Sequence, residues 1–212
     1  MSRYRGPRLR LQRRLGIRLA DLTKKRIRNR KRQNSLPGQH SYPRRRIRLS
    51  EFRMRLEEKQ KLRFNYSVTE RQLFRYIKEA RRIKGSTGLI ILQLLEMRLD
   101  TIVYRLNFAR TILAARQLVS HGHIQVNQKV VTIASFQCQP GDQVSVSQNK
   151  VSKGLIKDNL KANLKSRQLR YPPGHLIFTK SKMQGRIRKV VDRRAIRLPV
   201  NELLVVEYYS RR

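Results

Sequence analysis

The chain has 212 residues, with 51 Lys and Arg against 13 Asp and Glu, a formal net charge of +38 at neutral pH. So large an excess of one sign opposes a compact fold unless a polyanion neutralises it, and nucleic acid is the expected partner because its phosphates release counterions on pairing with cations. The single cysteine, Cys138, excludes an internal disulfide and a cysteine-based zinc site, and the longest apolar run, 89–92, is far too short to span a membrane.

The positive charge lies mainly at the two ends. Residues 1–50 carry a net +17 and residues 151–212 a net +12, whereas 51–97 carry +5 and 98–150 carry +4. Hydrophobic residues make up 39% of the chain, somewhat below the usual level for globular proteins. The middle of the chain is therefore expected to fold as an ordinary domain with a modest core.

Residues 1–48 alternate Arg with Leu, Ile or Tyr in short bursts and hold neither a helical nor a strand period. Chain breakers recur at Gly6-Pro7, Gly16 and Leu36-Pro37-Gly38. We predict a basic N-terminal arm over 1–44, extended apart from one short helical turn and ordered by its partner. A disordered solubilising tail is the alternative, but the strong sign bias favours binding.

The segment up to residue 97 predicts three helices. The first runs from Ser50 to Phe64, with favourable i,i+4 ion pairs and a thin apolar stripe, so one side is expected to face a charged partner. Residues 67–70 have the spacing of a capping box, and apolar residues follow at helical intervals. After a glycine-containing break at 84–88, residues 89–97 are apolar nearly all round and predict the most buried helix.

Residues 98–146 predict a small helix-helix-hairpin module. A helix over 99–106 is followed by a second helix that Thr111 caps and Gly122 ends. Residues 123–131 alternate at period two around Asn127-Gln128, which predicts a hairpin although the usual turn glycine is missing. A short strand over 143–147 follows.

The remaining sequence has a weaker pattern. Apolar positions within the Lys-rich stretch 148–170 suit a helix. We predict strands at 176–178 and 203–206, separated by a basic loop over 180–197.

No enzyme signature is present. His121 and His123 have no neighbouring carboxylate or cysteine in the sequence, whereas a metal site needs three or four convergent ligands. Segment 84–88 lacks the Gly-Lys-Ser/Thr ending of a phosphate-binding loop. We expect no catalysis, no metal and no cofactor.

Cations recur along residues 98–146, and folded RNA is recognised through its shape, phosphates and 2′-hydroxyls. Segments 98–106, 114–127 and 140–142 closely resemble the RNA-binding module of small-subunit ribosomal protein four, the S-four family. The resemblance continues, in the family's order, through 2–7, 36–40, 58–63, 69–72, 85–88 and 207–210. Residues 8–34 and 148–200 match loosely, and the zinc-binding cysteines of some bacterial members are absent.

This resemblance implies an α+β fold: a mainly helical domain with the small helix-helix-hairpin RNA-binding module inserted and an extended basic N-terminal arm. The expected domains are the arm at 1–44, a helical rRNA-binding domain at 45–97 completed by 175–212, the module at 98–160, and a C-terminal segment at 161–212. That segment is expected to pack back on the helical domain.

The resemblance further implies a structural constituent of the small ribosomal subunit rather than an enzyme. Such a protein binds small-subunit rRNA directly, nucleates assembly of the subunit body and supports translational accuracy. Its partners would be rRNA, neighbouring small-subunit ribosomal proteins and mRNA near the path by which mRNA enters, with no membrane and no small-molecule substrate. The Cys-free, Arg/Lys-rich version is most similar to plastid-encoded members, so we expect a plastid (chloroplast) ribosome, with a bacterial cytoplasm or a mitochondrion as alternatives.

The expected rRNA contacts are cations and ring side chains in three regions. In the arm they are Arg3, Tyr4, Arg5, Arg8, Arg44, Arg45 and Arg46. In the helical domain they are Arg53, Lys59, Lys61, Arg63, Arg71 and Arg75, and in the module Arg98, Arg116, His121, His123 and Lys129. We assign to the cores Leu73, Ile77, Leu92, Leu95, Leu99, Val103, Leu118, Ile124 and Val126.

Two other classes of protein compete with this interpretation. An RNA-modifying enzyme can carry the same module, but it needs a catalytic domain with an acidic residue, and 13 scattered acids leave little room for one. A basic DNA-packing or chaperone-like protein would bind duplex DNA as well as it binds rRNA, so competition between the two distinguishes it.

Overall fold

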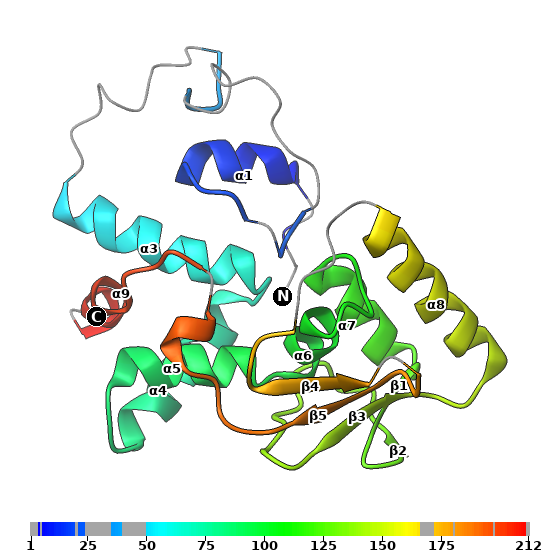
Figure 1. Cartoon of the computed structure of the whole chain (residues 1–212). Coiled ribbons are helices and arrows are strands. Elements are labelled where there is room, and N and C mark those ends of the chain that lie inside the picture. The colour runs from blue at the N-terminus through cyan, green and yellow to red at the C-terminus, as the bar shows by residue number, and fades with distance from the viewer. Residues whose placement is uncertain are drawn as a thin grey trace. The chain divides into compact units, whose positions relative to one another are not determined.

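The computed structural model describes residues 4, 6–19, 21–23, 35–39, 50–165, 172–179, 181–196 and 198–210. Two compact units are present, one formed by 1–88 with 199–212 and the other by 89–198 (Figure 1). Helices prevail in the first unit, and the second combines helices with an antiparallel sheet. The fold is therefore α+β, as the sequence predicts.

The first unit contains helices α1 (Arg8–Leu15), α3 (Glu51–Asn65), α4 (Glu70–Arg82) and α9 (Glu202–Ser210). Ser50 begins α3, because its side chain accepts a hydrogen bond from the backbone N–H of Arg53. The capping box of α4 is formed by Thr69 and Gln72, two residues later than the predicted box. Ser67 cannot cap this helix because it lies in a tight turn with a φ of 51°.

Helix α9 corrects the strand predicted at 203–206. Its β-branched and aromatic residues favour strands in general, but tertiary packing overrides such local preferences. Val205, Tyr208 and Tyr209 recur at helical spacing and are buried. Helix α9 lies alongside α3, where Arg55 Nε is 2.8 Å from Glu207 Oε2 (Figure 1).

The N-terminal segment is more ordered than an extended arm in its described part. Two leucines at i,i+4 spacing, Leu11 and Leu15, are buried on α1, and Gly16 ends the helix with a φ of 66°. Further along, the buried carboxylate of Asp21 accepts a hydrogen bond of 2.9 Å from Asn65 at the end of α3. Apolar burial and this buried hydrogen bond therefore order 8–19 and 21–23 within the first unit.

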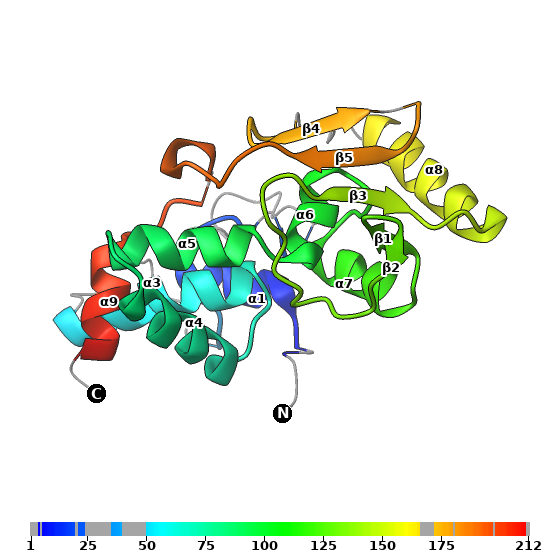
Figure 2. The same cartoon turned by 90° about the horizontal axis from the view of Figure 1, so that it is seen from below.

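The second unit contains most of α5 (Thr87–Glu96), then α6 (Leu99–Arg105), α7 (Ile112–Ser120) and α8 (Lys150–Lys165). Its strands are β1 (Ile124–Val126), β2 (Lys129–Val130), β3 (Gln143–Val146), β4 (Leu176–Thr179) and β5 (Gln184–Ile187). They form one antiparallel sheet in the order β2-β1-β3-β5-β4. Figure 2 shows the strands in this order, with β4 at the top. A short 3-10 helix, η2 (Arg193–Ala195), follows.

The predicted hairpin and caps of the module are confirmed. Thr111 caps α7 by accepting a hydrogen bond from Ala114 N–H, and Gly122 follows the helix with a φ of 74°. Asn127 and Gln128 adopt φ values of 48° and 68°, the left-handed pair that a tight hairpin turn requires. Asparagine adopts the left-handed conformation more readily than most residues, and β1 is paired with β2 and with β3, so the turn forms without a glycine.

The segment after the module differs from the expected domain plan. Strand β5 lies within the predicted basic loop 180–197, and it pairs with β3 through Val144 and Gly185. Because β4 pairs with β5 in turn, residues 176–187 extend the sheet of the second unit rather than complete the helical domain. Only 199–212 belong with the first unit.

The nine apolar residues assigned to cores are all buried. In the second unit one sheet face packs on the helices, with the Phe108 and Phe178 rings 5.8 Å apart edge to face. No described helix is long and apolar enough to cross a membrane.

We expect Gly185→Ala to destabilise the second unit. A Cβ at this position would lie 2.5 Å from both terminal methyl carbons of the fully buried Leu106, so the core must shift. Overpacking of this kind costs about 1–3 kcal/mol, and thermal denaturation followed by circular dichroism measures it. Gly154→Ala in α8 is the control, because nothing lies within 4 Å of its Cβ position and alanine favours a helix. Equal melting temperatures for the two variants would contradict the expectation.

Candidate nucleic-acid interface

A row of cations runs along the exposed side of α4. Arg71, Arg75, Lys78 and Arg82 follow one another at i, i+4, i+7 and i+11, opposite a buried side formed by Leu73, Ile77 and Ala80. The row is about 16 Å long at the rise of an α-helix. None of the four forms an ion pair with a described residue, although Lys78 Nζ lies 4.8 Å above the Phe74 ring.

Most cations of α3 have carboxylate partners within the first unit. Arg53 pairs with Glu57 at 3.2 Å, and Lys61 pairs with Glu58. Arg55 bridges Glu51 and Glu207 at 3.0 and 2.8 Å. Arg63 is half-buried, donates to Gln60 and covers the Phe64 ring at 5.2 Å. Their charge is therefore largely used within the protein.

Lys59 is buried and joins three helices. Its ammonium lies 3.0 Å from Glu70 Oε1 and 4.5 Å above the Tyr208 ring, and the Tyr209 hydroxyl donates to the same carboxylate oxygen at 2.6 Å. Burial by itself raises the pKa of Glu70, but the hydrogen bonds from Tyr209 and Lys59 outweigh it and leave the pKa below its usual value. Lys59 thus ties α3, α4 and α9 together, and its placement differs from the expected RNA-facing one.

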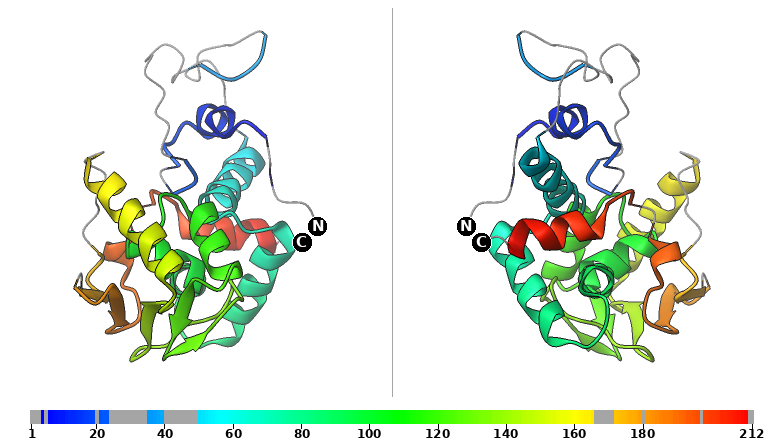
Figure 3. Two further views of the ribbon diagram at one scale, coloured as in Figure 1. Left: turned by 90° about the vertical axis from the view of Figure 1, so that its right-hand side faces the viewer. Right: turned by 90° about the vertical axis from the view of Figure 1, so that its left-hand side faces the viewer.

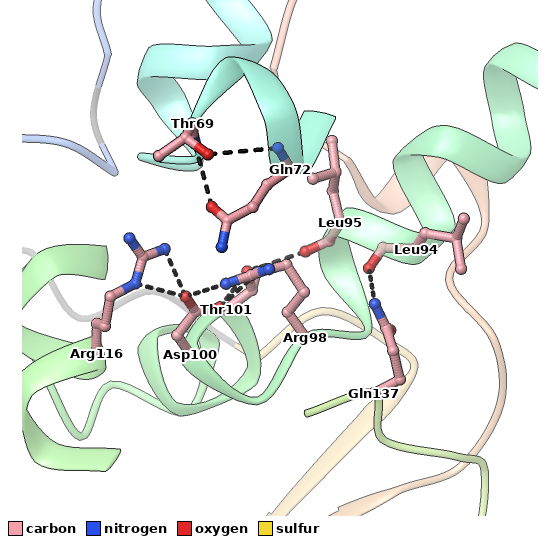
Figure 4. A network of polar contacts seen from close by, with 9 residues as sticks. All are labelled: Thr69, Gln72, Leu94, Leu95, Arg98, Asp100, Thr101, Arg116 and Gln137. Atoms are coloured by element: carbon pink, nitrogen blue, oxygen red, sulfur yellow. Dashed lines mark hydrogen bonds and ion pairs between the residues drawn. The ribbon is translucent and has the colours of Figure 1, made fainter. Parts of the chain in front are cut away.

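Arg98 and Arg116 converge on one buried carboxylate. Asp100 accepts two hydrogen bonds from Arg98, at 3.0 and 2.8 Å, and two from Arg116, at 3.0 and 2.6 Å (Figure 4). All three residues are buried, with Asp100 fully inaccessible. We had expected both arginines to contact rRNA, but their guanidinium groups instead hold α7 against the start of α6.

The two histidines of the module have different surroundings. His121 is exposed, with its ring centroid 6.1 Å from that of His123. His123 is half-buried, and its Nδ1 lies 2.9 Å from the hydroxyl of Ser152 on α8. Lys129 is exposed at the hairpin. Of the five module residues predicted to bind rRNA, His121 and Lys129 are thus the exposed ones.

Of the predicted rRNA contacts in the arm, the structure describes Tyr4 and Arg8. Tyr4 is 40% exposed, and its ring packs edge to face on Phe64 at 5.5 Å. Arg8 donates to the carbonyl oxygen of Leu22 at 3.3 Å. Arg3, Arg5, Arg44, Arg45 and Arg46 lie outside the described residues.

Sequence reasoning missed three features of the described structure. Lys78 and Arg82 complete the row on α4, and their i+7 and i+11 spacing from Arg71 is a signal that was available. The buried role of Asp100 has no comparable local signal, because Arg116 lies 16 residues away and reaches it only in the folded module. The exposed lysines of α8 were likewise left out of the predicted contacts.

The described residues offer little for catalysis. Cys138 is buried, which raises its pKa to about 12, so the thiol stays protonated. Within the described ranges, no three His, Cys, Asp or Glu residues gather to hold a metal ion. Unpaired surface cations, not a reactive centre, are what this arrangement supplies.

Comparison with known proteins gives consistent matches along the chain. Residues 3–96 match the family model for the ribosomal protein S4/S9 N-terminal domain, and residues 97–144 match the model for the S4 domain. The chain is 54% identical to small ribosomal subunit protein uS4 of a Cyanothece species and of Synechococcus elongatus, each alignment covering 100% of both chains. The protein of the same name from Nostoc punctiforme is also 54% identical, over 100% of this chain and 99% of its own.

We expect Asp100→Asn to destabilise the second unit strongly, because it leaves two buried guanidinium groups without a counter-charge. Breaking a buried ion pair from one side costs about 3–5 kcal/mol, which denaturant unfolding measures. Asp192→Asn is the control: it breaks the exposed pair with Lys189, and we expect no measurable change. A stable Asp100→Asn variant would show that the cluster does not hold the module together.

We also expect a pH dependence from His175. The residue is 2% exposed, and neither ring nitrogen has a hydrogen-bond partner. Burial lowers the pKa of His175. The charges of Glu96 and Asp192 raise this pKa and those of Arg105 and Lys189 lower it, and the net shift is downward. Folding therefore favours the neutral ring, so this contribution to stability is complete above the unfolded pKa of about 6.5 and is lost as the pH falls below it.

The melting temperature between pH 7.5 and pH 5.5 tests this expectation. His175→Phe should reduce the fall in melting temperature that the wild type shows, whereas the exposed control His121→Gln should keep it. The same pH dependence in the wild type and in His175→Phe would assign it to other groups.

Proposed function

The chain belongs to the family of small ribosomal subunit protein uS4, and we propose that it binds small-subunit rRNA chiefly through the unpaired cations of α4. Membership makes it a structural constituent of the small ribosomal subunit and not an enzyme. Its partners are accordingly rRNA and other ribosomal proteins.

The cation row on α4 carries this proposal. Phosphate contacts gain affinity from counterion release, which requires that the cation is not already neutralised by a carboxylate. Arg71 and Arg75 meet this condition, whereas Arg53 and Lys61 are paired within α3. We therefore rank the expected contacts of the helical domain by their pairing: those on α4 bind RNA phosphates, and those on α3 are mainly engaged in contacts within the protein.

Three finer roles are proposed on family membership. The protein nucleates assembly of the subunit body by binding rRNA early, and it supports translational accuracy together with neighbouring proteins. One face lies near the path by which mRNA enters. The large positive charge supports these roles, because a basic surface attracts RNA at long range and independently of sequence.

The ribosome in question is proposed to be that of a plastid. The identity of 54% to several cyanobacterial proteins supports this, since plastids derive from that lineage, and a bacterial ribosome is the alternative. Sedimentation of plastid extract tests it: the protein should be found in the small-subunit fraction of plastid ribosomes, and its absence there would favour the alternative.

Two double variants test the role of α4 at equal loss of charge. We expect Arg71→Gln with Arg75→Gln to weaken rRNA binding about tenfold or more at moderate salt. The slope of log affinity against log salt should become shallower by about 1.4–1.8, since each of the two lost phosphate contacts removes about 0.7–0.9. Arg53→Gln with Lys61→Gln should change the slope far less. Binding is measured on transcribed small-subunit rRNA of the cyanobacterial relative from Synechococcus elongatus.

Equal effects of the two double variants would refute the special role of α4. Duplex DNA serves as the competitor in every titration. If duplex DNA displaces the wild-type protein as readily as unlabelled rRNA does, direct and selective rRNA binding itself is wrong.

A further inference from the structure

Helix α8 carries a second row of cations, in the unit that contains the module. Lys150, Lys153, Lys157 and Lys161 are exposed and follow one another at i, i+3, i+7 and i+11. At 3.6 residues per turn their Cα–Cβ directions fall within an arc of about 80°. Their side chains form no hydrogen bond or ion pair with a described residue. Asp158, the single acid of this helix, lies about 60° or more around the axis from each of them.

The opposite side of α8 fixes its rotation. Ile156 and Leu160 are buried there, and Asn159 Nδ2 donates to the Phe108 carbonyl oxygen at 3.1 Å. Asn163 Nδ2 donates to the Asn107 carbonyl oxygen at 3.1 Å, and Ser152 contacts His123. Because the side chains that make these bonds, from Ser152 to Asn163, are spread over about three turns of one side, the helix presents its lysines in one direction. Figure 3 shows α8, in yellow, on the outer side of its unit.

Four like charges on one side of a helix repel one another, since residues three and four apart are neighbours on its surface. No carboxylate of α8 relieves this repulsion from the same side. An anionic partner along the row would offset this repulsion by attracting all four ammonium groups. The row is about 16 Å long, several times the axial spacing of about 3.4 Å between phosphates of one strand in duplex DNA, so it can face several successive phosphates of a nucleic acid.

The surroundings of the row favour RNA over a membrane surface. A helix that lies on a membrane presents a broad apolar face to the lipid, with its cations on the polar side. The broad apolar side of α8 is instead already buried within the unit, at Ile156 and Leu160. The exposed surface of α8 beside the lysines is a narrow strip with Val151, Leu155 and Asp158.

We propose that the lysine row of α8 binds the phosphate backbone of small-subunit rRNA, as a contact of the second unit that is separate from the α4 row. The proposal rests on the proposed function and adds a binding surface to it. Contact through ammonium groups alone reads no sequence, so α8 contributes affinity and orientation while other residues select the site. His123 supports this surface indirectly, by holding Ser152 on the buried side of α8.

The test compares the full-length wild type with two variants on transcribed Synechococcus elongatus small-subunit rRNA. The neutral variant carries Lys150→Gln, Lys153→Gln, Lys157→Gln and Lys161→Gln, and glutamine keeps the helix propensity of lysine. The shifted variant adds Val151→Lys, Leu155→Lys and Asp158→Lys, which restores the net charge of the wild type but places it on another side of α8. Circular dichroism and melting temperature verify that both variants fold.

Both variants should bind with a salt slope lower than that of the wild type by about 2 to 3, because up to four phosphate contacts are lost. Wild-type behaviour of the neutral variant would overturn the proposal. Wild-type behaviour of the shifted variant alone would also overturn it, because net charge would then suffice. A wild type that fails to bind rRNA selectively refutes the proposed function instead, so the two failures are distinguishable.

A photo-crosslinking residue at position 157, in assembled small subunits, identifies the partner directly. Crosslinks to rRNA are expected. Crosslinks exclusively to a ribosomal protein would show that α8 is a protein-binding surface and would overturn the proposal.

Discussion

The structure of this protein depends on where its few carboxylates lie, since 13 of them accompany 51 cationic side chains. Each carboxylate that lies beside a cation makes that cation part of the fold, whereas the exposed cations along α4 and α8 form no ion pair with a described residue. Asp100 is the clearest case, because one buried carboxylate holds both Arg98 and Arg116 (Figure 4). A buried guanidinium without a counter-charge is costly, so the second unit depends on this acid about as strongly as on a large core side chain.

The same division separates α3 from α4 in the first unit. Glu57 and Glu58 neutralise cations of α3, and Glu70 takes up Lys59, while the exposed side of α4 keeps its charge. Helix α8 repeats the pattern of α4, with an anchored side and a cationic side. Neither row needs a cleft or a reactive group. A protein that binds rRNA by such rows combines affinity with little sequence reading, and its rigid helices fix where the charges lie.

Much of the fold was predictable where a local pattern was strong. The helix stripe with Leu73 and Ile77, the cap at Thr111 and the turn at Asn127 each depend on residues near one another in sequence, and each is found as predicted. The helix α9 was mistaken for a strand because residues 203–206 fit both structures until their packing against α3 is known. Strand β5 was missed although its partner β4 closely precedes it, because Gln184–Ile187 holds a glycine and only one apolar residue and so has a weak strand pattern.

The sequence by itself determined the kind of partner and the family, because net charge and short motifs can be recognised without knowing the fold. It also determined which residues are cationic, but not which cations are free. Arg71 and Arg116 look alike in the sequence, and the first is exposed while the second is buried against Asp100. Only the tertiary structure decides this, since the electrostatic environment of a cation depends on acids and burial brought from distant positions of the chain.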